Sequence, residues 1–145
     1  MGWAVLGLLD LVHLLEGIGT GEAADVAAQV LERFAQTQGP DGNWAAVLDH
    51  PAADTETSAA AFYVAAALHP AARGLVSLSP QVLERATGAC RRALAEDGTF
   101  TGATADVLPS WDIKTYERAP TGPSPWAQGA AVRAFAALAR REHTA

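Results

Sequence analysis

Residues 55–68 read TETSAAAFYVAAAL, and no charged side chain occurs from Thr57 to Leu68. A helix that is apolar on every face is stable in water only when other elements surround it. The segment therefore predicts a buried helix over about residues 56–69. The other helices of the chain are expected to pack around it.

Four further segments show helical spacing of their apolar residues, and they alternate in character along the chain. Two are nearly all apolar, the first of them interrupted only by a stripe of Asp10, His13 and Glu16, and we expect both to be mostly buried. The other two have one polar and one apolar face, which is typical of helices that cover a core. We expect inner helices at about 3–17, 56–69 and 125–140, and outer helices at about 22–37 and 80–96.

Two similar turns follow the outer helices, GPDGNW at 39–44 and AEDGTF at 95–100. Each contains an Asp-Gly pair, which favours a tight turn, and an aromatic residue two positions after the Gly. Their recurrence suggests repeated helical hairpins within a single domain over residues 1–145, with Trp44 and Phe100 sealing the hairpin ends. The long connections into the inner helices are where a binding site is expected.

Composition excludes several classes of function. The chain has 145 residues, half of them hydrophobic, and a net charge of −6, which argues against a nucleic-acid partner. Cys90 is the sole cysteine and no two histidines have metal-ligand spacing, so we expect no metal and no cofactor. The N-terminus lacks the basic residues of a secretion signal, and no apolar run is long enough to span a membrane. We therefore expect a cytoplasmic protein without a membrane partner.

Three stretches resemble a known family: GWAVLGLLDLV at 2–12, residues 39–68 from GPDGNW to the AAAL of the buried helix, and PSPWAQGAAVRAFAAL at 123–138. They are similar, in the same order, to the C-terminal part of glycoside hydrolase families 88 and 105, the unsaturated glucuronyl and rhamnogalacturonyl hydrolases. The resemblance implies an all-α fold, in which these helical hairpins form about half of an (α/α)6 barrel. In the family the segment before the Gly-Trp reads Trp-x-Arg-Gly-Asn, so the chain is expected to start within a motif.

The resemblance also implies a reaction. In this family an aspartic acid protonates the C4=C5 double bond of a terminal unsaturated uronic acid, water adds at C5, and the hemiketal collapses to release the sugar. That aspartic acid lies in the N-terminal half of the family, for which this chain has no counterpart. We therefore assign no catalytic residue and expect the chain alone to be inactive on oligosaccharides that contain an unsaturated uronic acid.

Three tryptophans are candidate substrate-binding residues. Trp3 matches a family tryptophan that lines the sugar site, although a Trp near a chain end can also simply pack. Trp126 begins an inner helix, where packing in the core is the alternative to ligand contact. Trp111 lies in a long loop that either rims the sugar site or is a surface loop anchored by its aromatic side chains.

Thr57 and Ser58, at the start of the buried helix, are the remaining candidates for substrate binding. Their alternative role is to cap that helix together with Glu56, with Thr55 or Asp54 as the N-cap residue. An acidic side chain in a first helical turn is also favoured by the helix dipole.

Two functions stay open at this level. The chain is either part of a carbohydrate-active hydrolase or a non-catalytic helical scaffold with a sugar-binding or protein-binding groove. Because the helices at 3–17 and 125–140 would each lack an inner neighbour, we expect a homodimer or association with the missing N-terminal half.

Overall fold

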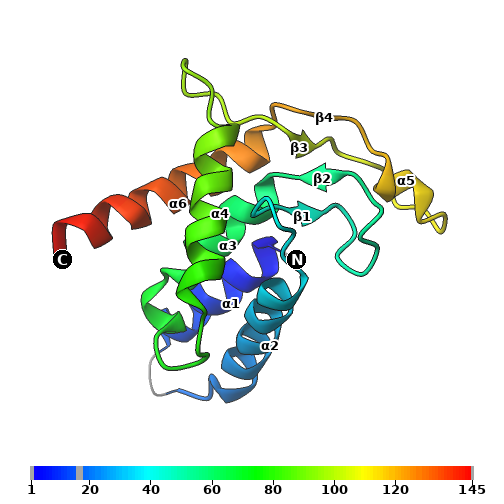
Figure 1. Cartoon of the computed structure of the whole chain (residues 1–145). Helices are drawn as coiled ribbons and strands as arrows, with labels where there is room; N and C mark the ends of the chain where they lie inside the picture. The colour runs from blue at the N-terminus through cyan, green and yellow to red at the C-terminus, as the bar shows by residue number, and fades with distance from the viewer. Residues whose placement is uncertain (1, 16–17, 145) are drawn as a thin grey trace.

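The computed structural model describes residues 2–15 and 18–144, so residues 16 and 17 of the helix expected over 3–17 lie outside it. Helices account for most of the fold, and two short antiparallel ribbons join them (Figure 1). The helices are α1 (Gly2–Leu14), α2 (Gly21–Thr37), α3 (Ser58–Ala67), the 3-10 helix η1 (Pro70–Ala72), α4 (Pro80–Ala93), α5 (Lys114–Glu117) and α6 (Pro125–Thr144). The predominantly helical fold predicted from the sequence is confirmed.

The two ribbons are features that helical periodicity does not reveal. β1 (Trp44–Ala45) pairs with β2 (Thr55–Glu56), and β3 (Ala103–Thr104) pairs with β4 (Thr121–Gly122). Each ribbon closes one of the two long loops, the first just before α3 and the second just before α6. The helix expected from residue 56 therefore begins at Ser58, because Glu56 belongs to a strand.

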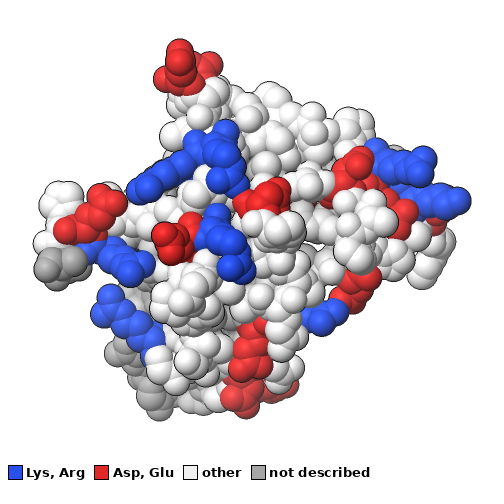
Figure 2. All heavy atoms as spheres, in the orientation of Figure 1, with Lys and Arg blue, Asp and Glu red and all other residues white. Residues whose placement is uncertain are grey.

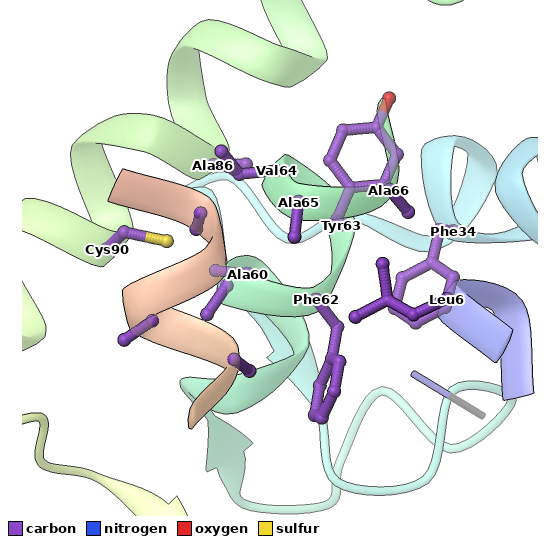
Figure 3. Packing of buried hydrophobic residues seen from close by; sticks show 14 of the residues in the cluster. Leu6, Phe34, Ala60, Phe62, Tyr63, Val64, Ala65, Ala66, Ala86 and Cys90 are labelled. Carbon is purple, nitrogen blue, oxygen red and sulfur yellow. The ribbon is translucent and has the colours of Figure 1, made fainter. Parts of the chain in front are cut away.

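α3 is the centre of the core. Every residue from Ala60 to Ala66 is buried, and α3 packs against α1, α2, α4 and α6. Figure 3 shows Leu6 and Phe34 reaching its aromatic side, while Ala86 and Cys90 of α4 lie on another side. The alanines of α3 allow close approach of the surrounding backbones, since short side chains hold the helices only slightly apart.

The helices fall into two sets. α1, α3 and α6 all begin beside the two ribbons, whereas α2 packs outside α1 and α4 packs outside α3 (Figure 1). α4 begins at Pro80 and α6 at Pro125, where each Ser-Pro pair indicates a helix start.

α1 is buried on one face only, which corrects the expectation of a mostly buried helix. Val5, Leu6 and Leu9 are fully buried, but Leu11 and Leu14 on the opposite face are 43% and 79% exposed. α1 packs mainly against α2, α3 and η1, and these contacts leave the face of Leu11 and Leu14 exposed.

A polar cluster of Asp10, His69 and Arg133 links α1 to α6 and to the residue before η1. Both terminal nitrogens of the Arg133 guanidinium donate to the Asp10 carboxylate, at 2.9 and 3.1 Å, and the bond from Arg133 lowers the pKa of Asp10. His69 Nε2 lies 3.1 Å from the same carboxylate, and burial lowers the pKa of His69, so its ring is neutral at pH 7. His13, expected within a buried polar stripe, is exposed and meets the His69 ring edge-on.

The Asp-Gly turns place two aromatic residues in the core. Trp44 is 1% exposed and its Nε1 donates to the carbonyl oxygen of Phe34 at 2.8 Å. Phe100 is fully buried, and its backbone N–H donates to Gln128 Oε1 at 2.8 Å. Both aromatic residues therefore close the ends of the hairpins, as their positions after the turns predict.

The two turn glycines provide a matched test of this packing. Gly42 and Gly98 have φ values of 87° and 85°, a conformation that side chains with a Cβ rarely adopt. A Cβ at Gly42 would lie 2.2 Å from the carbonyl oxygen of Arg85, whereas nothing lies within 4 Å of one at Gly98. Gly98→Ala should lower the free energy of unfolding by about 1 kcal/mol, and Gly42→Ala by about 3 kcal/mol, because α4 must also shift.

The comparison is made by urea unfolding monitored by circular dichroism. Equal losses in the two variants would show that the turn does not pack tightly against α4.

Candidate functional site

A cavity of about 1070 Å³ lies at the end of the molecule where α1, α3 and α6 begin. Its wall includes both ribbons and the loop that precedes α5. The aromatic side chains that line it are Trp3, Phe34, Phe62, Trp111, Tyr116 and Trp126, and the acidic ones are Asp49, Glu56 and Asp106. The site is thus mainly apolar, with polar groups at a few positions.

Two tryptophans from different helices meet in this wall. The rings of Trp3 and Trp126 lie 6.4 Å apart between centroids and are nearly perpendicular, at 89°. Trp3 also meets Phe62 edge-on at 5.0 Å, and Trp126 Nε1 donates to Asp106 Oδ2 at 3.3 Å. Because the two tryptophans are 52% and 59% exposed, each leaves part of its ring open to a ligand.

Gly2 explains how Trp3 reaches this position. A Cβ at residue 2 would lie 2.2 Å from the Phe62 ring, so only glycine lets the start of α1 approach α3 this closely. Gly2 therefore lets Trp3 reach Phe62, and the two residues act together. Its glycine is a contributor to the site that the sequence analysis missed.

Glu56 organises the start of α3. Its carboxylate accepts bonds from the backbone N–H groups of Ser58 and Ala59 at 3.1 and 2.9 Å, and from the Ser58 hydroxyl at 2.8 Å. It also accepts a bond from the Thr104 N–H at 3.1 Å, which ties α3 to the second ribbon. The negative charge is well placed beside the N-terminus of a helix.

The cap of α3 differs from the one expected. Thr57, and not Thr55 or Asp54, is the N-cap residue, and its side chain makes no capping bond because Glu56 already satisfies the N–H groups. The Thr57 hydroxyl instead donates to the carbonyl oxygen of Thr101 at 2.6 Å.

The five candidate binding residues separate into two groups. Trp3, Ser58, Trp111 and Trp126 all line the cavity, although the Ser58 hydroxyl is engaged by Glu56. Thr57 is not among the lining residues, since its side chain packs beside Gly102. Tertiary structure thus brings together residues that are more than 100 positions apart in the chain, Trp3 and Trp126.

The second long loop is fastened to the first by polar contacts. His50 Nδ1 lies 2.9 Å from Glu117 Oε1, and the N–H of Asp54 donates to the carbonyl oxygen of Glu117 at 2.9 Å. The hydroxyl of Tyr116 accepts a bond from the N–H of Ser110 at 2.7 Å, beside the fully exposed Trp111. These contacts hold one rim of the cavity in place.

The titratable groups near the cavity already have protein partners. Asp106 accepts from Trp126, Asp49 pairs with Arg33, and Glu56 caps α3.

Cys90 lies in the core and does not line the cavity. Burial raises the pKa of its thiol to about 12, so it stays protonated and unreactive. Across residues 2–15 and 18–144, no group of three His, Cys, Asp or Glu side chains could hold a metal ion.

The comparisons with known proteins agree with the three motifs. The model of Glycosyl Hydrolase Family 88 matches residues 1–142. The chain belongs to this family. The resemblance stated from the sequence is therefore confirmed.

The fold of this family 88 domain is similar to that of several solved structures. A possible member of glycoside hydrolase family 105 from Klebsiella pneumoniae superposes with a TM-score of 0.87 at 20% identity, covering 97% of this chain and 38% of that chain. A possible family 105 member from Salmonella enterica superposes with a TM-score of 0.84 at 21% identity, covering 97% of this chain and 39% of that chain. A family 88 hydrolase from Bacteroides vulgatus superposes with a TM-score of 0.72 at 22% identity, covering 96% of this chain and 41% of that chain. The family 88 domain thus spans about two fifths of the solved chains.

A search of curated proteins finds no match. Within the described part of the chain, no helix has both the length and the apolar character needed to cross a membrane.

Removing the Glu56 carboxylate tests its role in the family 88 domain. Glu56→Ala should lower the free energy of unfolding by about 2 kcal/mol, because two N–H groups of α3 and one of β3 lose their acceptor. Glu56→Gln should lower the free energy of unfolding by less, since its amide oxygen still accepts hydrogen bonds. Urea unfolding measures the loss, and Glu84→Ala on the exposed face of α4 is the matched control, expected within 0.5 kcal/mol of wild type. A similar stability for all three variants would contradict the capping role.

Proposed function

We propose that this domain is the sugar-binding part of an unsaturated glucuronyl or rhamnogalacturonyl hydrolase. The observation that carries the proposal is the pair of half-exposed, nearly perpendicular rings of Trp3 and Trp126 in one cavity. An aromatic face offers a flat apolar platform to a pyranose ring, and two such faces at a right angle give it a floor and a wall. Its ligand is an oligosaccharide with a terminal unsaturated uronic acid.

Polar groups suited to sugar hydroxyls surround the two rings. Ser110, Ser124 and Thr104 line the cavity, and Asp106 bonds to the indole of Trp126 and retains oxygens that can accept. Together with Trp111, which follows Ser110 in the same loop, these groups support binding of a polar, ring-shaped ligand.

The described charged residues that line the cavity are all acidic, which affects how it could bind a uronate. Its acidic residues are Asp49, Glu56 and Asp106, whereas none of the described residues that line it is Lys or Arg. A uronate carboxylate requires a cationic or donor-rich partner when it leaves water. We infer that this partner, like the catalytic aspartic acid, belongs to the part of the family fold that the chain does not span.

The helices fit the proposed half of an (α/α)6 barrel. α1, α3 and α6 serve as inner helices and α2 and α4 as outer ones, with the sugar cavity at the ends where the inner helices begin. An incomplete ring leaves an open edge at α1 and another at α6. We therefore propose that the domain acts in association, either with a second copy or with the remaining helices of the barrel.

The second candidate function is a non-catalytic scaffold that keeps the sugar cavity. The engagement of Glu56 in the α3 cap and of Asp49 with Arg33 favours it, because neither carboxylate is arranged to transfer a proton to a ligand. Binding and catalysis are therefore tested separately.

The binding test changes the two rings. Trp3→Ala and Trp126→Ala should each weaken binding of an unsaturated uronyl oligosaccharide by at least about tenfold, because each removes one stacking face. Isothermal titration measures the affinity, and circular dichroism should show nearly unchanged helix content. Val26→Ala, on an exposed position of α2 outside the cavity, is the control. Unchanged affinity in both Trp variants, or a large loss of helix content, would instead assign the tryptophans to packing.

The catalytic test uses the chain alone. We expect no hydrolysis of unsaturated uronyl disaccharides at micromolar protein, because each described acidic residue that lines the cavity is already engaged and none is free to protonate the double bond. The absorbance of the C4=C5 bond is followed over time against a blank. A decrease above that of the blank would show that this chain contains a catalytic acid after all.

A further inference from the structure

α1 has an apolar face that no described element covers. Ala4, Gly7, Leu11 and Leu14 recur at intervals of three and four residues, and all four are exposed. This spacing places them in one stripe along the helix, opposite the buried face of Val5 and Leu9. The stripe contains no charged side chain.

α6 has a stripe with the same spacing. Gly129, Val132, Ala136 and Ala139 are all exposed and uncharged, and Val132 is 60% exposed. The C-terminal half of α6 projects beyond the other helices in Figure 1. Such a projecting helix gains little stabilisation from its own chain, since helices in water depend mostly on packing.

The two stripes are complementary in size when the helices run parallel. With α1 displaced by two residues toward the C-terminal end of α6, Ala4 lies opposite Gly129 and Gly7 opposite Val132. The large Leu11 and Leu14 then lie opposite Ala136 and Ala139. Alternation of three and four residues, with large side chains facing small ones, is the pattern of side chains that insert into holes of a neighbouring helix.

The charges near the same ends are also complementary. The exposed Glu22 and Asp25 lie at the start of α2, next to the end of α1, and Arg140 and Arg141 lie near the end of α6. Figure 2 shows acidic side chains over α2, at the lower part of the molecule, and basic ones towards the projecting end of α6. A parallel pairing of α1 with α6 from another molecule brings the two groups together, which favours that orientation.

We propose that two copies of this chain assemble about a two-fold axis, with α1 of each copy packed against α6 of the other. The axis makes the two contacts between α1 and α6, here called seams, identical. Both apolar stripes of each copy are then covered, and no open surface is left to add a third copy. The inner helices α1, α3 and α6 of both copies then form one continuous ring. This inference goes beyond the proposed sugar binding and does not depend on it.

Sedimentation equilibrium of the full chain at micromolar concentration is the first test. The wild type should have the mass of two chains, and Leu14→Glu and Ala136→Glu should each halve it by placing a charge in the seam. Leu108→Glu is the matched control, because Leu108 is 85% exposed in a loop away from both stripes, and it should stay dimeric. Circular dichroism should show wild-type helix content in all three. A monomeric wild type, or a dimer that Leu14→Glu leaves intact, would overturn the proposal.

Disulfide cross-linking distinguishes this seam from other dimers. A chain carrying both Gly7→Cys and Val132→Cys should oxidise to a covalent dimer, whereas each single variant should stay uncrosslinked. A side chain at residue 7 meets nothing within 4 Å in the chain itself, and the native Cys90 is buried, so neither interferes. Cross-linking through Gly7→Cys alone would show α1 packed against α1, and absence of cross-linking in the double variant would show that α1 and α6 do not meet. Either result would overturn the proposed seam.

Discussion

The arrangement of this domain depends on the burial of α3. Its residues from Ala60 to Ala66 expose almost no surface, and a helix without a polar face is excluded from the solvent. α1, α2, α4 and α6 therefore surround it. Alanines occupy most of its length, so these neighbours approach closely, and the larger Phe62, Tyr63 and Val64 fill the remaining space (Figure 3).

The start of this buried helix links the core to the cavity. An all-apolar helix still needs acceptors for its first N–H groups, and Glu56 supplies them from the strand that precedes α3. The same carboxylate bonds to Thr104 in the second ribbon, so one residue joins both loops that surround the cavity. Phe62, one turn into α3, then contacts Trp3. Stability of the helix start and shape of the site are thus connected through the same few residues.

Open edges are the other consequence of building around one central helix. α3 has neighbours on several sides, but α1 and α6 each have only one covered face. The Asp10 and Arg133 pair holds α1 and α6 in a defined relation without covering their outer faces. The relatives with solved structures extend beyond this part of the fold, which spans about two fifths of their length.

By itself, the sequence determined the helices and the family of this protein. Apolar periodicity, the Ser-Pro starts and the Asp-Gly turns are local signals, because a helix or a turn is decided by residues a few positions apart. Tertiary structure decided the cap and the cavity. Nothing near Glu56 in the sequence indicates that its carboxylate would also reach Thr104, and nothing in the spacing of Trp3 and Trp126 indicates that their rings would meet. Such contacts form only when distant segments are brought together by burial of α3, so local pattern cannot determine them.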